Sequence, residues 1–130
     1  MKAPTAGALC HCRICQKAYG VPHMAGVRFD DGVEFTQGTP TYFRSSEVAQ
    51  RGFCTGCGSP LVFVYDKAPD MWIMIGSLDH PEDWPMTAEA LWGQVVHTQT
   101  NYKIEWEVLN DGLPQVKSPF RDAAEALLCR

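Results

Sequence analysis

The segment Cys10-His11-Cys12-Arg13-Ile14-Cys15 contains three closely spaced cysteines, and it decides how the rest of the sequence is interpreted. Side chains alternate along an extended chain, so Cys10 and Cys12 are expected to face the same side. The spacing from Cys12 to Cys15 is typical of a turn in which two thiolates bind one metal ion. Three thiolates from this segment can therefore converge on a single metal ion.

A second cluster, Cys54-Thr55-Gly56-Cys57, repeats the C-x-x-C spacing. Gly56 and the following Gly58 lower the steric cost of a tight turn and leave backbone N–H groups free to face sulfur. Zinc takes four nitrogen or sulfur ligands in structural sites, and three plus an open position in catalytic sites. Two such clusters predict bound zinc, and the plainer alternative is a set of buried free cysteines that act as small apolar residues.

The five clustered cysteines leave two arrangements open. One zinc ion can take four of the five and be purely structural. Alternatively, Cys10, Cys12 and Cys15 hold one zinc ion with an open position, while Cys54 and Cys57 form half of a second site. Three thiolates around Zn²⁺ make a net negative centre, which is a poor Lewis acid for generating hydroxide. The second arrangement therefore favours chemistry on a substrate thiol or thiol adduct.

Composition limits the other function classes. The 130 residues are enough for one domain, 1–130, and the 45% hydrophobic and 20% charged fractions are ordinary for a globular protein. A net charge of −4 opposes binding to nucleic acid, which needs a basic face. The longest apolar runs, 61–65 and 71–76, are far shorter than the roughly 20 residues that span a bilayer. Clustered cysteines without a signal peptide indicate a cytoplasmic, reducing environment.

The local patterns predict an all-β domain of short antiparallel strands joined by Gly/Pro turns. We expect these strands over residues 23–29, 33–36, 41–44, 60–65, 71–76, 94–98 and 102–108. One helical turn is expected over 79–84, with Asp79 as its cap. A short C-terminal helix is expected over 118–129, because Ser118 can cap it and Pro119 suits its first position.

Several longer motifs resemble the glutathione-dependent formaldehyde-activating enzyme family, which includes the centromere protein V-like zinc domain. They are Cys10-His11-Cys12-x-x-Cys15, Tyr42-Phe43-Arg44-Ser45-Ser46, Arg51-Gly52-Phe53-Cys54-x-x-Cys57-Gly58-x-Pro60-Leu61, Gly76-Ser77-Leu78-Asp79 and Asp111-Gly112-Leu113-Pro114. The resemblance covers about residues 9–114. It implies a β-tent fold, a zinc cofactor and carbon–sulfur lyase activity on S-hydroxymethylglutathione, the adduct of formaldehyde with glutathione.

The resemblance also implies separate roles for the two cysteine clusters. Cys10, Cys12 and Cys15 would carry a catalytic zinc ion, whose fourth position receives the sulfur or hydroxyl group of the substrate. Cys54 and Cys57 would belong to a structural zinc ion, which relatives complete with an upstream Cys-x-Cys pair that has no counterpart before Cys10. The alternative reading is a non-catalytic zinc-binding module that mediates protein interaction through an exposed β surface.

Three polar residues near the second cluster are candidate substrate ligands. Arg44, Ser45 and Arg51 could bind the carboxylates of a glutathione-like peptide, the arginines through bidentate pairs. Ordinary salt bridging at the surface is the alternative.

The histidines and tryptophans are expected to have structural roles. His11 should point away from the flanking cysteines, toward the core or the solvent. The other three histidines, His23, His80 and His97, are expected to be isolated surface or loop residues. The four tryptophans are expected in the core, because large aromatic side chains dominate burial in small β domains. They are Trp72, Trp84, Trp92 and Trp106.

Overall fold

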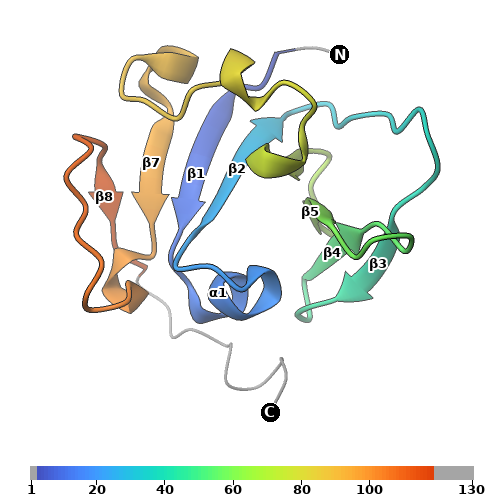
Figure 1. Ribbon diagram of the computed structural model, residues 1–130, viewed down its shortest axis with the longest axis horizontal. Helices are drawn as coiled ribbons and strands as arrows, with labels where there is room; N and C mark the ends of the chain where they lie inside the picture. Colours follow the sequence, from blue (N-terminus) through green and yellow to red (C-terminus); the bar gives the residue numbers. More distant parts are fainter. Residues whose placement is uncertain (1–2, 119–130) are drawn as a thin grey trace.

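The computed structural model describes residues 3–118, and these build one eight-stranded sheet in the order β3-β4-β5-β6-β2-β1-β7-β8 (Figure 1). The strands are β1 (Ala6–Cys10), β2 (Met24–Phe29), β3 (Thr41–Arg44), β4 (Ala49–Phe53), β5 (Pro60–Tyr65), β6 (Met71–Met74), β7 (Val95–Thr98) and β8 (Gln115–Val116). The helical elements are α1 (Arg13–Tyr19) and the 3₁₀ turns η1 (Ile75–Ser77), η2 (Pro81–Asp83), η3 (Ala90–Gly93) and η4 (Thr100–Tyr102). The C-terminal helix expected over 118–129 lies outside the described residues, apart from Ser118.

The all-β fold class is confirmed, but the sheet is mixed rather than antiparallel. Strand β7 pairs in parallel with β1, and β8 pairs in parallel with β7, whereas the other strand pairs are antiparallel. The parallel pairing aligns Leu9 with His97 and Cys10 with Thr98. Residues far apart in the chain therefore meet at the end of β1. Within residues 3–118, no helix is both long and apolar enough to cross a membrane.

The centre of the sheet is built from β-branched residues in register. Val27 on β2 lies opposite Ile73 on β6, which in turn lies opposite Val62 on β5. All three are buried and share one apolar cluster with Phe29. Strands with this composition suit a pleated, half-buried surface, which explains why the expected strands over 23–29, 60–65 and 71–76 formed.

Two expected strands are absent, and one expected strand is shorter. Residues 33–36 are irregular, since Val33 and Phe35 pack on the central cluster without joining a ladder. The strand expected over 102–108 is also absent: Tyr102 ends the 3₁₀ turn η4, and residues 103–108 are irregular. Lys103 Nζ donates hydrogen bonds to the carbonyls of Ile104 and Glu107 and holds a compact loop there. The strand expected over 71–76 ends at residue 74 and continues as the 3₁₀ turn η1.

Two further corrections concern the helical turn and the tryptophans. The expected turn forms over Pro81–Asp83, but its N-cap is His80 rather than Asp79, and the His80 side chain makes no capping hydrogen bond. Trp92 and Trp106 are 79% and 71% exposed rather than buried in the core.

Helix α1 was not expected from the sequence. It begins after Cys12, whose Sγ accepts a hydrogen bond from the backbone N–H of Cys15, and it ends at Gly20 in the left-handed conformation with φ 64°. In Figure 1, α1 lies between two parts of the bent sheet, with β1, β7 and β8 on one side and β3, β4 and β5 on the other. This placement puts the Cys12–Cys15 turn between the two sides of the bent sheet.

Candidate functional site

Three thiols converge where β1 ends and α1 begins. Cys10 is the last residue of β1, Cys12 is the N-cap of α1, and Cys15 lies in the first turn of that helix. The three sulfur atoms all lie within 4.8 Å of one another, and all three residues are buried. The arrangement could hold a metal ion. Cys12 has extended backbone angles (φ −63°, ψ 151°), and the first turn of α1 brings the third thiol, Cys15, into place.

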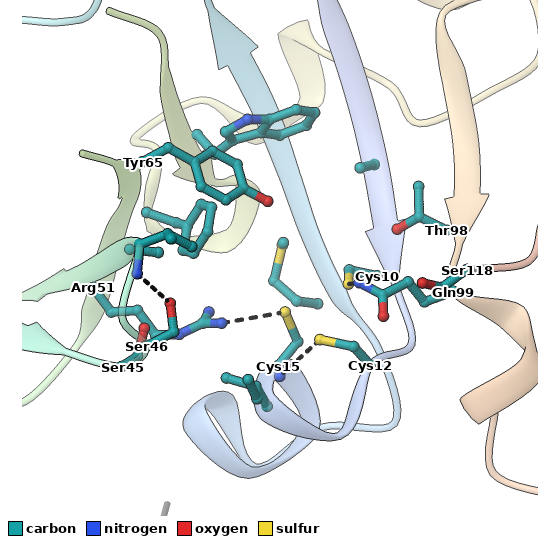
Figure 2. A pocket seen from close by; sticks show the side chains of 17 residues that line it. Cys10, Cys12, Cys15, Ser45, Ser46, Arg51, Tyr65, Thr98, Gln99 and Ser118 are labelled. Carbon is teal, nitrogen blue, oxygen red and sulfur yellow. Dashed lines mark hydrogen bonds between the residues drawn. The ribbon is translucent and has the colours of Figure 1, made fainter. Parts of the chain in front are cut away.

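The thiols lie beside a cavity of about 460 Å³ between the two parts of the sheet (Figure 2). Its walls are mainly apolar, with polar groups from β4, β5 and β7. The lining residues include Met24, Ser45, Arg51, Phe63, Tyr65, Trp72, Thr98 and Gln99. A site of this kind combines water exclusion with a few convergent polar groups, which is typical of small-molecule binding sites.

The three thiols interact strongly with one another. Hydrogen bonds from Cys12 and Cys15 lower the pKa of Cys10. Donating to Cys10 raises the pKa of Cys12 and Cys15, and burial adds to both increases. Without a metal ion, the cluster therefore carries one thiolate and two thiols. A divalent cation would displace the two remaining protons.

A buried arginine faces this cluster. The Arg51 guanidinium donates to Cys15 Sγ at 3.6 Å and to the Tyr19 hydroxyl at 2.8 Å. It also lies 4.8 Å from the ring centre of Phe63 and 5.0 Å from that of Tyr19. Burial lowers the pKa of Arg51, but its interactions with the Cys15 sulfur and with Tyr19 more than offset this effect and raise the pKa overall. The cation therefore stays charged beside the sulfur atoms.

The other two candidate substrate ligands differ in position. Ser45 lines the cavity and is buried, and its Oγ has no hydrogen-bond partner among residues 3–118. Arg44 is exposed and makes a bidentate pair with Asp66, with distances of 2.9 and 3.1 Å. The structure thus brings Ser45 and Arg51 to the cavity, whereas Arg44 forms a salt bridge away from the cavity lining.

The second cysteine pair lies elsewhere. Cys54 and Cys57 occupy the turn between β4 and β5, where Cys57 is exposed and its Sγ lies 3.0 Å from Ser59 Oγ. The hydrogen bonds with Ser59 lower the pKa of Cys57. Within the described part of the chain, no group of three or more potential metal ligands includes either residue.

Sequence reasoning missed a cluster of histidines. His11 and His97 are 0% and 1% exposed, with His11 Nε2 2.8 Å from His97 Nδ1. His23 and Glu107 join them, so His23 and His97 are not isolated as expected. His97 is a buried residue of strand β7, whereas His23 is a partly exposed loop residue, as expected. His80 is exposed, as expected. The parallel pairing of β1 with β7, which local patterns do not reveal, brings His97 beside His11.

The fold and the thiol cluster define a β-sheet domain with a potential metal centre beside a cavity. The family model of the glutathione-dependent formaldehyde-activating enzyme matches residues 1–94, and the chain belongs to this family. The matched range includes both cysteine pairs and Arg51. A comparison with curated proteins found no match to this chain.

Proposed function

We propose that this chain is a zinc-dependent carbon–sulfur lyase acting on a thiol adduct such as S-hydroxymethylglutathione. The observation that carries the proposal is the convergence of three buried thiols beside a cavity that also holds a buried arginine. Membership of the glutathione-dependent formaldehyde-activating enzyme family supports glutathione and formaldehyde as the substrate class. A cytoplasmic setting, where thiols stay reduced, is part of the proposal.

The donor set of the cluster fits zinc. Cys10, Cys12 and Cys15 offer three sulfur ligands, which is the number that leaves a catalytic zinc ion one open position. Bound there, Zn²⁺ would supply a Lewis-acidic position for the sulfur or hydroxyl oxygen of the adduct. Three thiolates and Zn²⁺ carry a net charge of −1, which the Arg51 guanidinium beside Cys15 balances. This balance makes it easier to place a further anionic sulfur at the site.

The proposed reaction is the reversible cleavage of the adduct. The carbon–sulfur bond breaks with its electron pair moving to sulfur, the hydroxyl group loses its proton as the carbonyl forms, and the sulfur is protonated. The products are formaldehyde and the free thiol. Negative charge develops on sulfur in the transition state, so a fixed cation such as Arg51 stabilises it.

The remaining cavity residues would orient the adduct. The Ser45 hydroxyl lacks a hydrogen-bond partner among the described residues, and it can bind a polar group of the peptide part. Phe63, Trp72 and Met24 form apolar walls that exclude water from the reacting carbon. The cavity volume of about 460 Å³ falls within the roughly 300–1,000 Å³ of small-molecule sites.

The test is exchange spectroscopy by NMR on the zinc-loaded full chain with glutathione and carbon-13-labelled formaldehyde. The wild type should accelerate exchange between free and adduct formaldehyde. Cys12→Ser should abolish that acceleration while the amide spectrum stays that of a folded protein. Cys57→Ser, outside the cavity, is the matched control and should exchange like the wild type. Equal acceleration by Cys12→Ser and the wild type would contradict the lyase proposal.

The interaction-module alternative has one observation in its favour. Strand β3 forms an edge of the sheet and all four of its residues are exposed, including Tyr42 and Phe43. An exposed edge strand can pair with another chain. This alternative predicts no change in amide chemical shifts around the cavity when glutathione or its adduct is added.

A further inference from the structure

Three metal-ligating side chains meet outside the proposed lyase site. His11 Nδ1 lies 3.6 Å from Glu107 Oε2, and His23 Nδ1 lies 2.5 Å from Glu107 Oε1. One ligand atom from each residue lies within 4.8 Å of the other two. None of the three residues lines the cavity beside the thiols. His11 alternates with Cys10 and Cys12 along the chain, which explains why it points to a different side.

Two polar atoms of this cluster that face each other are buried without hydrogen bonds. The His11 side chain is fully buried, and the side chains of Glu107 and His23 are 13% and 28% exposed. Across residues 3–118, no hydrogen bond reaches His11 Nδ1 or Glu107 Oε2, whereas His23 Nδ1 pairs with the other carboxylate oxygen, Glu107 Oε1. Buried polar atoms without partners are rare, and a bound ion or water molecule is one established explanation.

A chain of hydrogen bonds determines which nitrogen of His11 carries the lone pair. Asp111 Oδ2 lies 2.7 Å from His97 Nε2, so this nitrogen carries the proton and donates to the carboxylate. In the neutral ring His97 Nδ1 is then the acceptor, and His11 Nε2 donates to it at 2.8 Å. The lone pair of neutral His11 therefore sits on Nδ1 and faces Glu107. Metal-ligating histidines are commonly oriented by a hydrogen bond of this kind.

Two electron-rich atoms that face each other in a buried site favour a cation beside them, either a proton on the histidine or a metal ion. Neither His11 Nδ1 nor Glu107 Oε2 has a proton to share in these states, so no hydrogen bond can join them. The ligand atoms of a tetrahedral zinc ion lie about 3.3 Å apart, and the separation of 3.6 Å is close to this spacing.

The backbone around these residues is already held in place. The Gln16 side-chain amide donates to the carbonyls of His11 and Tyr102, which ties helix α1 to both loops. Lys103 Nζ donates to the backbone carbonyl of Glu107 and stabilises the loop that carries this carboxylate. A site on such a fixed frame needs little reorganisation to bind an ion.

We propose that His11, His23 and Glu107 form a second metal site, selective for a divalent transition-metal ion such as Zn²⁺. Two imidazole nitrogens and one carboxylate leave an open coordination position, as in His₂Glu zinc sites. Glu107 and Zn²⁺ together carry a net charge of +1, so this site is a stronger Lewis acid than the three-thiolate centre. Asp111, reached through His97, partly balances that charge.

Metal titration of the full chain tests this site, because the two clusters differ in their spectroscopic signatures. Cobalt(II) bound to thiolates gives intense sulfur-to-metal charge-transfer bands, whereas cobalt(II) bound by histidine and carboxylate gives weak ligand-field bands alone. The wild type should bind cobalt in both environments. Glu107→Gln should lose one metal equivalent, together with the weak ligand-field bands of the histidine and carboxylate site, while the bands of thiolate-bound cobalt remain. The matched control Glu105→Gln, two residues away on an exposed side chain, should behave like the wild type.

A second pair of variants and a direct measurement keep the test decisive. His23→Gln should reproduce the loss, whereas His80→Gln, at an exposed histidine, should not. Cadmium NMR on the wild type should show one resonance in the thiolate region and another in the nitrogen/oxygen region. Unchanged metal content in both Glu107→Gln and His23→Gln would overturn the proposal, as would a cadmium spectrum that lacks the nitrogen/oxygen resonance. Failure of the lyase assay would leave these metal readouts unaffected.

Discussion

The two C-x-x-C segments of this protein share a spacing but have different surroundings. Cys12 and Cys15 lie at the start of a helix, are buried, and are joined by Cys10 and faced by Arg51. Cys54 and Cys57 lie in a hairpin turn, where Cys57 is exposed and bonded to Ser59. A motif therefore supplies possible ligands, but the third thiol, the nearby charge and the cavity determine what the ligands can do.

The largest expected difference between the two segments is in zinc affinity. Cys15→Ser removes one of three convergent ligands. Loss of a residue that only hydrogen-bonds a metal ligand typically lowers metal affinity by about 10- to 100-fold. Loss of a ligand itself should cost more, so zinc affinity at the thiol cluster should fall by at least about 100-fold. Cys54→Ser should leave that affinity unchanged. Competition titrations with a chromophoric chelator measure both variants. A similar loss in both would show that the two segments share one metal ion.

Zinc affinity at the thiol cluster should also fall steeply with pH. Hydrogen bonds to Cys10 and burial raise the pKa of Cys12 to about 11 and raise that of Cys15 as well, so both carry protons at neutral pH. Zinc must displace these protons, and lowering the pH favours the protonated, metal-free form. With two protons released, affinity should drop roughly 100-fold per pH unit. Affinity that is independent of pH would contradict this account of the cluster.

Substitution of the buried Arg51 should affect adduct exchange and stability, whereas substitution of the exposed Arg44 should not. Arg51→Gln leaves Tyr19 and Cys15 without their donor, so adduct exchange should slow by about 10-fold and stability should fall by about 1–3 kcal/mol. Arg44→Gln removes an exposed pair with Asp66 and should change neither measurement. Exchange spectroscopy and thermal melting provide the comparison. A larger exchange defect in the Arg44 variant would place substrate binding outside the cavity.

An effect of similar size to that of Arg51→Gln is expected in the alkylation rates of the metal-free protein. Cys57 is exposed and Ser59 lowers its pKa, so it should react with iodoacetamide about 10-fold faster than the buried Cys15. Mass spectrometry of peptides sampled over time gives both rates. Faster labelling of Cys15 would mean that the thiol cluster opens readily to solvent.

The sequence predicted the features that depend on neighbouring residues. Clustered cysteines predicted a potential metal site, and β-branched runs such as Pro60–Tyr65 predicted strands. Helix α1 was missed because it spans seven residues and its N-cap is a cysteine, which is not among the preferred capping residues. The strand expected over 102–108 failed because hydrogen bonds from Lys103 fix a loop there.

The histidine cluster could not be predicted for a different reason. His11 and His97 are 86 positions apart, and only the parallel register of β1 with β7 brings them together. Glu107 reaches them from an irregular loop. The alternation of side chains around Cys10 and Cys12 correctly indicated that His11 points away from the thiols, but it gave no sign of its partners.

Exchange spectroscopy on the zinc-loaded double variant Cys54→Ser/Cys57→Ser tests the central claim most directly. If the buried cluster alone carries the chemistry, this variant should exchange labelled formaldehyde between its free form and the glutathione adduct as fast as the wild type. A folded double variant that binds zinc at Cys10, Cys12 and Cys15 but no longer accelerates exchange would contradict the account.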